Sequence, residues 1–405
     1  CDPQGLIQAL CNRGRTGELK DVKLQHLHTE GSAPYAEAEF EGIFFLESYF
    51  VGSNVRKPTQ EGYADYVPVH LSETQKLIRS GIHPVDVAMI QVCPPDKHGY
   101  VSMGTSVDAT LAAVQNAKTV IAVINPNVPR AWGDAIIKLS DIDIFCEDDT
   151  PLIEAHPATL TEQDIAIGKN VASLIEDGAT LQMGIGAIPN AVLSQLGNHK
   201  NLGIHTEMFS DGVIDLVEKG VITGKCKTLH PGKLVATFLM GSQRLYDFVD
   251  NNPDVALFPV DYVNDPYVIR QNRQLISINS CIEIDLSGQV CSETIGPKQF
   301  SGTGGQVDYI RGAALSEGGK SILAMPSTAA RGKVSRIVPY LAAGAAVTTS
   351  RNEVDYVVTE YGIAHLKGKT LRQRAESLIR IAHPDFRESL TEEFFHRFPL
   401  ALQTI

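Results

Sequence analysis

Short apolar runs alternate with amphipathic helical stretches along most of this chain, and this alternation limits its fold more than any other feature. Residues 85–93 and 119–125 are two apolar runs, and residues 108–117 between them show a helical pattern. The second run, TVIAVIN, is apolar at nearly every position, as in strands of parallel sheets covered on both faces. A strand, a helix and a second strand at this spacing are typical of a parallel crossover unit. The pattern predicts an α/β fold with mostly parallel sheets.

The alternation continues toward the end of the chain. Thr161 is a candidate cap for a helix that Gly178 would end. Further helices are expected over residues 191–196 and 371–381. Further strands are expected at residues 180–183, 234–240, 255–260, 276–285, 321–325 and 354–359.

A polar, proline-marked connector divides the chain near residues 148–161, where EDDTP and HP interrupt the alternation. A chain of 405 residues is long for one core and sufficient for two. We therefore expect two open α/β domains, spanning residues 1–155 and 156–405.

Composition and charge limit the kinds of molecule that this chain is expected to bind. The chain is 43% hydrophobic and 20% charged, as in ordinary globular proteins. Its net charge of −12 argues against a nucleic-acid partner, and no apolar stretch approaches the roughly 20 residues that cross a bilayer. An anionic small ligand remains compatible with this charge, because backbone amides can bind phosphate.

The 7 cysteines are scattered and show no CxxC spacing, which indicates reduced thiols rather than a disulfide framework. Cys93, Cys146 and Cys281 lie in or beside apolar runs and are expected to be buried. We expect a soluble intracellular protein, mitochondrial in a eukaryote and cytoplasmic in a bacterium. The chain begins with Cys1 rather than Met, and any targeting segment would have stood before this point.

A glycine turn follows the expected strand at residues 180–183. Its residues are Gln182, Met183, Gly184, Ile185 and Gly186, and a helical pattern comes next. Glycines at such a turn let bare backbone approach a phosphate or a pantetheine chain, although a plain strand-to-helix turn would look the same. The turn lacks the GxGxxG spacing of a dinucleotide site and the lysine of a P-loop, so neither NAD nor ATP is indicated.

Glu207 lies in the segment LGIHTEMFSDGVIDL, residues 202–216. Most of the 47 acidic residues of such a chain are solvated surface charges. Glu207, however, has the apolar neighbours Ile204, Met208, Phe209 and Val213. A carboxyl group in this setting can be desolvated, with a shifted pKa and a reactive role.

A second glycine cluster, FSGTGGQVD, spans residues 300–308. Its three glycines, among them Gly305, suggest a loop whose N–H groups face a negative group, although a flexible hairpin is an equal alternative. In open α/β sheets ligands bind at the carboxyl ends of strands, where such loops gather.

A metal site gains little support. His26, His28 and Glu30 would share a face if they lay on a strand, but no fourth ligand accompanies them, so a polar strand face is favoured. The GxSxG motif of serine hydrolases is absent from the sequence.

Several motifs together resemble the acetyl-CoA hydrolase/transferase family of glutamate-dependent CoA-transferases, in particular its 4-hydroxybutyrate and butyryl-CoA:acetate members. In the second half they are QMGIGAIP, LGIHTEMFSDG, FSGTGGQVDYIRGA, AAVTTSRNEVDYVVTEYGIAHLKGK and IAHPDF. In the first half they are HLHTEG, FVGSNVRKPTQEGYADYVPVHLSE, VCPPDKHGYVSMGTSVD and PRAWGD. The resemblance covers nearly the whole chain.

The resemblance implies two CoA-transferase-type domains with the active site in the cleft between them. Glu207 corresponds to the catalytic glutamate, residues 182–186 to a CoA-contacting turn, and Ile282 and Gly305 to later CoA and oxyanion contacts. Family members also carry a further N-terminal helix and strand before the point where this chain starts.

The resemblance further implies acyl-CoA and short-chain carboxylates as substrates, no permanently bound cofactor, and a homodimer. CoA transfer would proceed by ping-pong through a glutamyl-CoA thioester. An acyl-CoA hydrolase that uses the same intermediate is a close alternative. A metabolite-binding protein without turnover and a sugar-phosphate isomerase of related fold are more distant alternatives.

Overall fold

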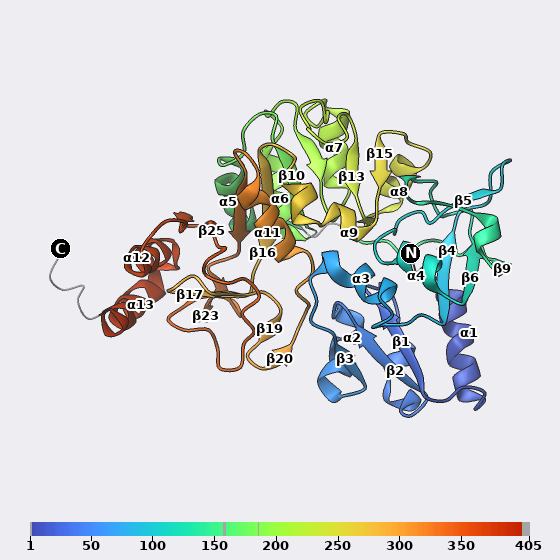
Figure 1. The fold of residues 1–405 in the computed structure, drawn as a ribbon. Helices are drawn as coiled ribbons and strands as arrows, with labels where there is room; N and C mark the ends of the chain where they lie inside the picture. Colours follow the sequence, from blue (N-terminus) through green and yellow to red (C-terminus); the bar gives the residue numbers. More distant parts are fainter. Residues whose placement is uncertain (1, 157–158, 185, 399–405) are drawn as a thin grey trace.

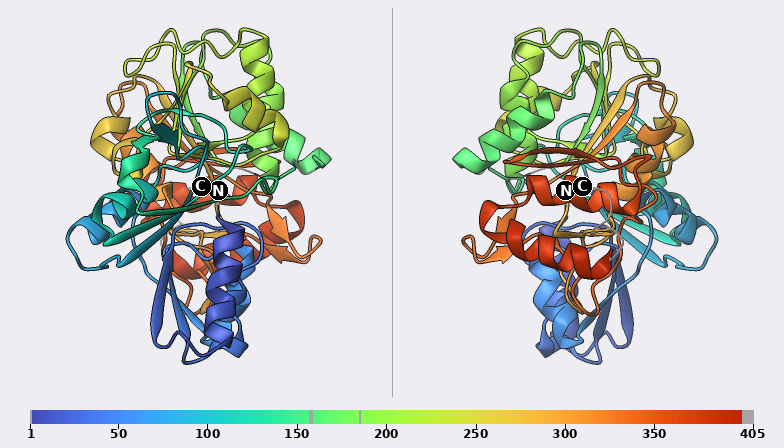
Figure 2. Two further views of the ribbon diagram at one scale, coloured as in Figure 1. Left: turned by 90° about the vertical axis from the view of Figure 1, so that its right-hand side faces the viewer. Right: turned by 90° about the vertical axis from the view of Figure 1, so that its left-hand side faces the viewer.

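The computed structural model describes residues 2–156, 159–184 and 186–398 (Figure 1). It shows a mixed α/β architecture with mostly parallel sheets. Seen from either side, the elements drawn in blue form one end of the molecule and the green elements beside the large sheet form the other (Figure 2).

Two small parallel sheets lie in the first 150 residues. One has the strand order β1-β2-β3 and the other the order β4-β6-β9. The helices are α1 (Gln4–Arg15), α2 (Ser53–Glu61), α3 (Thr74–Arg79) and α4 (Thr110–Asn116), with 3-10 turns η1 (Pro34–Ala36), η2 (Ala38–Phe40), η3 (Leu71–Glu73) and η4 (Leu139–Asp141). The strands are β1 (Val22–His26), β2 (Phe44–Ser48), β3 (Ala64–Tyr66), β4 (Val87–Val92), β5 (Tyr100–Ser102), β6 (Thr119–Ile124), β7 (Trp132–Gly133), β8 (Ile136–Lys138) and β9 (Ile144–Glu147).

A nine-stranded sheet dominates the rest of the chain, in the order β26-β25-β21-β16-β10-β11-β13-β15-β7. Only the pairing of β25 with β26 is antiparallel in this sheet. Its strands are β10 (Thr180–Met183), β11 (Gly203–His205), β13 (Leu234–Ala236), β15 (Val255–Leu257), β16 (Leu275–Ser280), β21 (Lys320–Ala324), β25 (Tyr356–Thr359) and β26 (Gly362–His365), together with β7.

Helices and short strand pairs surround the large sheet. The helices are α5 (Glu162–Ala172), α6 (Ala187–Gln195), α7 (Gly212–Glu218), α8 (Gln243–Val249), α9 (Val260–Val263), α10 (Pro266–Ile269), α11 (Gln306–Leu315), α12 (Leu371–Ile381) and α13 (Pro384–Arg397). The short strands are β12 (Met208–Phe209), β14 (Phe238–Leu239), β17 (Glu283–Asp285), β18 (Val290–Cys291), β19 (Thr294–Ile295), β20 (Lys298–Gln299), β22 (Thr328–Ala329), β23 (Val334–Ser335) and β24 (Ile337–Val338).

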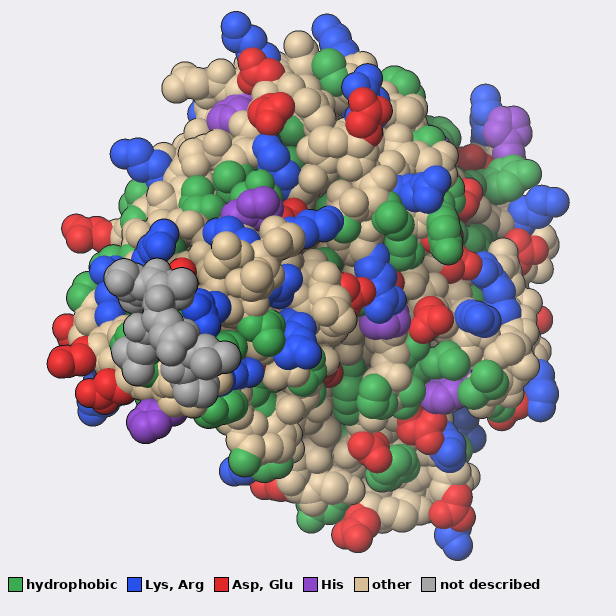
Figure 3. Space-filling view, turned by 60° about the vertical axis from the view of Figure 1, so that its left-hand side comes forward, with side chains coloured by type: hydrophobic (Ala, Val, Ile, Leu, Met, Phe, Trp, Pro, Cys, Tyr) green, Lys and Arg blue, Asp and Glu red, His purple; other side chains and the backbone are tan. Residues whose placement is uncertain are grey.

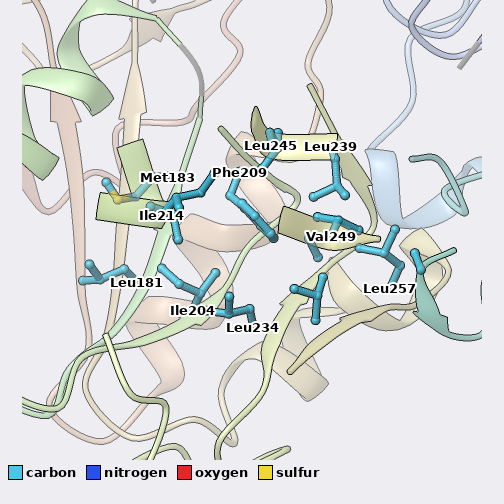
Figure 4. Close-up of a cluster of buried hydrophobic side chains, with 14 of the residues drawn as sticks. Leu181, Met183, Ile204, Phe209, Ile214, Leu234, Leu239, Leu245, Val249 and Leu257 are labelled. Carbon is cyan, nitrogen blue, oxygen red and sulfur yellow. The ribbon is translucent and has the colours of Figure 1, made fainter. Parts of the chain in front are cut away.

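The largest core cluster runs through both parts of the chain. It joins side chains of β4 and β6 to side chains of the large sheet and of its helices. Figure 4 shows its centre, where Leu181, Ile204 and Leu234 from neighbouring strands face Ile214 and Phe209. Because β7 also pairs with β15, residues before the connector complete the large sheet. The division near residue 155 remains a proposal.

The α/β prediction is confirmed, and several expected elements match closely. The expected strand at 180–183 and helix at 371–381 have those bounds. Thr161 caps α5 by accepting a hydrogen bond from the Asp164 N–H. That helix ends at Ala172, well before Gly178, and turn residues follow from Ser173 onward.

Other predictions need correction. The expected strand at 276–285 is two strands interrupted at Cys281 and Ile282, and the expected strand at 234–240 is interrupted at Thr237. Cys93 and Cys281 are buried as expected, whereas Cys146 is exposed because it lies on the edge strand β9. Among the residues that the structure describes, no helix is long and apolar enough to cross a membrane.

The packing of α5 on α6 leads to a first prediction. A Cβ atom added to Gly168 would lie 2.6 Å from the backbone of Ala191, closer than real atoms pack. We expect Gly168→Ala to lower the free energy of unfolding by about 1–3 kcal/mol, as overpacking of helix contacts does. Urea denaturation measures this. Gly197→Ala is the control, since its Cβ meets no atom within 4 Å; equal loss in both variants would contradict the prediction.

Candidate active site

The order of strands in the large sheet marks one place for a ligand. From β10 the chain adds β11, β13 and β15 on one side, and then crosses back to add β16 and β21 on the other side. The order therefore reverses between β10 and β16, and such a reversal opens a crevice at the carboxyl ends of the strands. The glycine turn follows β10, Glu207 follows β11, and Ile282 follows β16. The sheet brings these three predicted site segments to one edge.

Gln182 ties the two strands at the reversal together. Its side-chain oxygen accepts hydrogen bonds from Ser277 Oγ at 2.8 Å, from the Ile278 N–H at 3.2 Å and from Asn279 Nδ2 at 3.1 Å. Its Nε2 donates to Asn279 Oδ1 at 3.3 Å. The side chain is buried, so Gln182 holds β10 and β16 in place.

The glycine turn offers backbone rather than side chains. The side chain of Met183 packs in the core (Figure 4), and its N–H donates to Thr206 Oγ1 at 3.1 Å. A Cβ atom at Gly184 or at Gly186 would meet no atom within 4 Å. Gly186 has a φ of 113°, a conformation that favours glycine, and it immediately precedes α6. The predicted contact Ile185 lies outside the described residues.

Glu207 occupies the short break between β11 and β12. Its backbone carbonyl accepts from the N–H groups of Thr237 at 2.9 Å and Phe238 at 3.2 Å. The buried His205 just before it donates from Nε2 to the Val263 carbonyl at 2.9 Å. These contacts fix the backbone on both sides of the glutamate, so its carboxyl group has a defined position at the edge of the sheet.

Two hydrogen-bond donors lie beside the Glu207 carboxyl group. Asn264 Nδ2 donates to Glu207 Oε2 at 2.9 Å, and the backbone N–H of Gly305 also donates to the carboxyl. Burial raises the pKa of Glu207 to about 7; the bond from Asn264, the nearby His28 and the bond from Gly305 each oppose that rise. Near neutral pH this carboxyl is therefore a poorly solvated group that exchanges its proton readily.

Gly305 approaches the glutamate too closely for any other residue. A Cβ atom there would lie 2.0 Å from Glu207 Oε2 and 2.3 Å from Asn264 Nδ2. The second glycine cluster is thus a close-contact loop against Glu207, and the alternative of a free hairpin is not what the structure shows. The backbone at Gly305 therefore runs directly beside the Glu207 carboxyl group.

Asn264 was not predicted from the sequence. It follows α9, just beyond the strand expected at 255–260, of which only residues 255–257 form a strand. It is fully buried, and its Oδ1 has no hydrogen-bond partner. An asparagine in a mixed PVDYVNDP segment carries no signal that would single it out.

Two further candidate segments, at Ile282 and at residues 26–30, lie at or just beyond the ends of strands β16 and β1. Ile282 is partly buried beyond the end of β16, and its N–H donates to the Cys291 carbonyl at 2.8 Å. Strand β1 ends at His26, so His28 and Glu30 do not continue one strand face as the sequence suggested. His28 instead pairs with Glu30 at 2.8 Å. Within the described parts of the chain, no group of His, Cys, Asp and Glu could hold a metal ion.

Comparison with known proteins identifies the family of the chain. Sequence models of the acetyl-CoA hydrolase/transferase N-terminal and C-terminal domains match residues 1–154 and 241–394. The chain belongs to the acetyl-CoA hydrolase/transferase family. Membership confirms the prediction that the chain is an enzyme of the CoA-transferase type with an α/β fold.

Individual relatives in this family are similar over nearly their full length. The chain is 59% identical over 397 residues to the 4-hydroxybutyrate coenzyme A transferase of Clostridium kluyveri, which covers 98% of this chain and 92% of that one. It is 52% identical to the succinyl-CoA:acetate/propanoyl-CoA:succinate CoA transferase of Fasciola hepatica, with 98% and 83% covered. The solved 4-hydroxybutyrate CoA-transferase of Porphyromonas gingivalis has a TM-score of 0.80 at 44% identity, with 96% of each chain covered.

The raised pKa of Glu207 predicts a pH dependence. With Glu207 as the nucleophile that we propose below, only the ionised carboxylate could attack, so kcat/KM for an acyl-CoA should rise as the pH increases through about 7 and level off above it. Initial rates between pH 5.5 and 9 measure this. A rate already constant from pH 5.5 upward would mean that burial does not raise this pKa.

The close approach of Gly305 predicts a second effect. Gly305→Ala should displace the Glu207 carboxyl and lower kcat by about 10²-fold or more, comparable to the loss of an oxyanion donor. The protein should still fold, since the added methyl lies at the site and not in the core. Gly197→Ala is the matched control and should keep its turnover. An active Gly305→Ala variant would show that the loop is free to move away.

Proposed function

We propose that this chain moves coenzyme A between a short-chain acyl-CoA and a free carboxylate such as acetate, with Glu207 as the covalent nucleophile. The observation that carries the proposal is the Glu207 carboxyl group itself. It is partly buried with a raised pKa, it accepts hydrogen bonds from Asn264 and Gly305, and it lies at the strand-order reversal beside a glycine turn open to a ligand. Acetyl-, butyryl- and 4-hydroxybutyryl-CoA are the acyl donors that the named relatives suggest.

The chemistry needs an intermediate as activated as the substrate. A Glu207 carboxylate oxygen attacks the thioester carbonyl, the C–S bond breaks, and an acyl-glutamyl anhydride and CoA thiolate form. The thiolate then attacks the glutamyl carbonyl and releases the free acid, which leaves a glutamyl-CoA thioester. An incoming carboxylate reverses both steps and departs as the new acyl-CoA.

Asn264 and Gly305 fit the second attack. When the thiolate adds to the glutamyl carbonyl, negative charge develops on an oxygen of Glu207 itself. Both donors already point to that carboxyl group, so they would stabilise the charge without rearrangement. Preorganised donors of this kind are among the largest contributions to catalysis.

The remaining site residues would hold the coenzyme. The open backbone at Gly184 and Gly186 precedes α6 and can lie against the pantetheine or phosphate groups. Residues 182–186 and Ile282 are therefore our proposed CoA contacts, with Gln182 acting mainly through the strands that it joins. CoA and acyl-CoA act here as substrates, and we propose no permanently bound cofactor.

A hydrolase that uses the same thioester is the second candidate. Glu207 keeps partial solvent exposure in this structure, so water could reach the intermediate. Transfer is favoured over hydrolysis only if bound substrates exclude that water.

Three further features belong to the proposal. We propose a homodimer by family analogy, and a division into domains of residues 1–155 and 156–405. The described cysteines are free thiols, which supports a reducing compartment: the mitochondrial matrix in a eukaryote or the cytoplasm in a bacterium.

Peptide mass spectrometry tests the mechanism. Incubation with acetyl-CoA, without an acceptor acid, should leave a CoA adduct on the peptide that contains residues 202–216, and Glu207→Ala should show none. Adding butyrate, 4-hydroxybutyrate or buffer alone then separates transfer from hydrolysis. A native protein that turns over acetyl-CoA while Glu207→Ala turns it over equally well would refute the role of this glutamate.

A further inference from the structure

The loop that brings Gly305 to Glu207 is held by residues from the opposite end of the sequence. Residues 299–308 contact α2, β3 and η3, which come more than 220 positions earlier. Figure 1 shows this first part of the chain, in blue, beside the segment of β19 and β20, in orange. None of the reacting groups discussed above lies on α2, β3 or η3.

Tyr66, at the end of β3, forms hydrogen bonds with the middle of the glycine cluster. Its hydroxyl accepts a hydrogen bond from the Thr303 N–H at 2.9 Å and shares a second with Thr303 Oγ1 at 3.2 Å. Thr303 lies two residues before Gly305. Gly302, on the other side of Thr303, packs against Phe50 and the Tyr66 ring, where a Cβ atom would lie 3.0–3.2 Å from their atoms.

Helix α2 holds the start of the loop. Arg56 Nε donates to the Phe300 carbonyl at 2.7 Å, and its guanidinium carbon lies 3.7 Å from the centre of the Phe300 ring. Gln60 Nε2 donates to the Gln299 carbonyl at 3.0 Å. Both bonds go to backbone carbonyls, so they fix the path of the chain rather than the identity of its side chains.

The turn η3 holds the end of the loop. The Leu71 N–H donates to the carbonyl of Gly304 at 3.2 Å, and Gly304 is the residue next to Gly305. The Ser72 N–H and hydroxyl donate to the two carboxyl oxygens of Asp308 at 3.1 and 2.8 Å. Asp308 lies in the first turn of α11, the helix that Gly305 begins.

The carboxyl group of Asp308 is buried and is held by hydrogen bonds from Ser72. Burial raises the pKa of this carboxyl to about 7, the hydrogen bonds from Ser72 oppose the rise, the charge of Glu207 adds to it, and Arg311 opposes it. No cation lies within ion-pair distance of Asp308 in the described part of the chain. A buried, unpaired carboxyl whose hydrogen bonds lead to another part of the fold is expected where a position must be held.

We propose that Tyr66, Ser72 and Asp308 are positioning residues that set the Gly305 N–H against Glu207. The first part of the chain would then control catalysis by a glutamate that lies in the second part. This inference rests on the proposed function, since it assumes that Gly305 and Glu207 act together. Because the loop is held at both ends, the Gly305 N–H keeps its position relative to Glu207 through both attacks of the cycle. A misplacement of about 1 Å can cost about 10²-fold in rate.

Steady-state kinetics on two removal variants test the inference. Tyr66→Phe removes the hydroxyl that holds Thr303, and Ser72→Ala removes one bond to Asp308. Each should lower kcat about tenfold while the KM for acetyl-CoA stays within about twofold, because the coenzyme contacts are untouched. Tyr267→Phe is the matched control, since the side chain of this α10 tyrosine is 70% exposed and has no hydrogen bond to the described residues 299–308.

Asp308 gives a sharper comparison. In Asp308→Asn the amide oxygen can accept the Ser72 N–H and the amide nitrogen can donate to the rotated Ser72 hydroxyl, so positioning survives without the charge. Asp308→Asn should therefore keep most of the native kcat, while Asp308→Ala should lose about tenfold. Hydrogen exchange of the peptide containing residues 299–308 should be faster in Tyr66→Phe, Ser72→Ala and Asp308→Ala only.

The outcomes separate this inference from the proposed function. If Glu207→Ala is inactive and native protein forms the CoA adduct, but Tyr66→Phe and Ser72→Ala match Tyr267→Phe in kcat, the positioning role is overturned. A raised KM with unchanged kcat also overturns it, because these residues would then bind substrate. If a removal variant fails to fold, the Asp308→Asn and Asp308→Ala pair decides, and equal loss in both would mean that the charge matters rather than the position.

Discussion

The parallel alignment of β10 with its neighbours β11 and β16 is the constraint on which the rest of the site depends. Parallel strands end at the same edge, and the strand order reverses beside β10, so the loops after these three strands must meet. The Gln182 network then fixes the spacing between β10 and β16 by hydrogen-bonding both ends of a buried amide. The site is therefore assembled from segments that lie far apart in the sequence.

The same arrangement explains how a weak nucleophile can work. A carboxylate in water is well solvated and unreactive toward a thioester, and burial removes that solvation at a cost that appears as a raised pKa. Asn264 and Gly305 return part of the lost stabilisation as directed hydrogen bonds. In the mechanism that we propose, these two donors lie where negative charge develops on Glu207 during the second attack.

The fold class was predicted correctly, and the sequence marked the glycine turn, Glu207 and the glycine cluster as candidate site segments, because each carries a local signal; Ile282 was implied only by the family resemblance. Continuous apolar runs identify buried strands such as β6, and glycines beside a strand identify turns such as that at Gly184 and Gly186. Asn264 and Tyr66 carry no such signal, since a single polar or aromatic residue is common in any loop. Their importance comes only from tertiary contacts across 57 positions to Glu207 and 237 positions to Thr303. Cys146 was misjudged for the same reason, because an apolar strand does not show whether it lies at an edge.

The division of the site between distant segments has a physical consequence. The carboxyl of Glu207 and the N–H of Gly305 belong to different segments of the large α/β unit, so the sheet alone does not determine their separation. Contacts from β3 and η3 supply that missing restraint, and they do so through hydrogen bonds to backbone atoms and to one buried carboxyl. Hydrogen bonds are directional whereas apolar contacts are not, and a buried polar group left unpaired is costly. The loop therefore has one favoured position relative to Glu207, which apolar packing of the same segments would not provide.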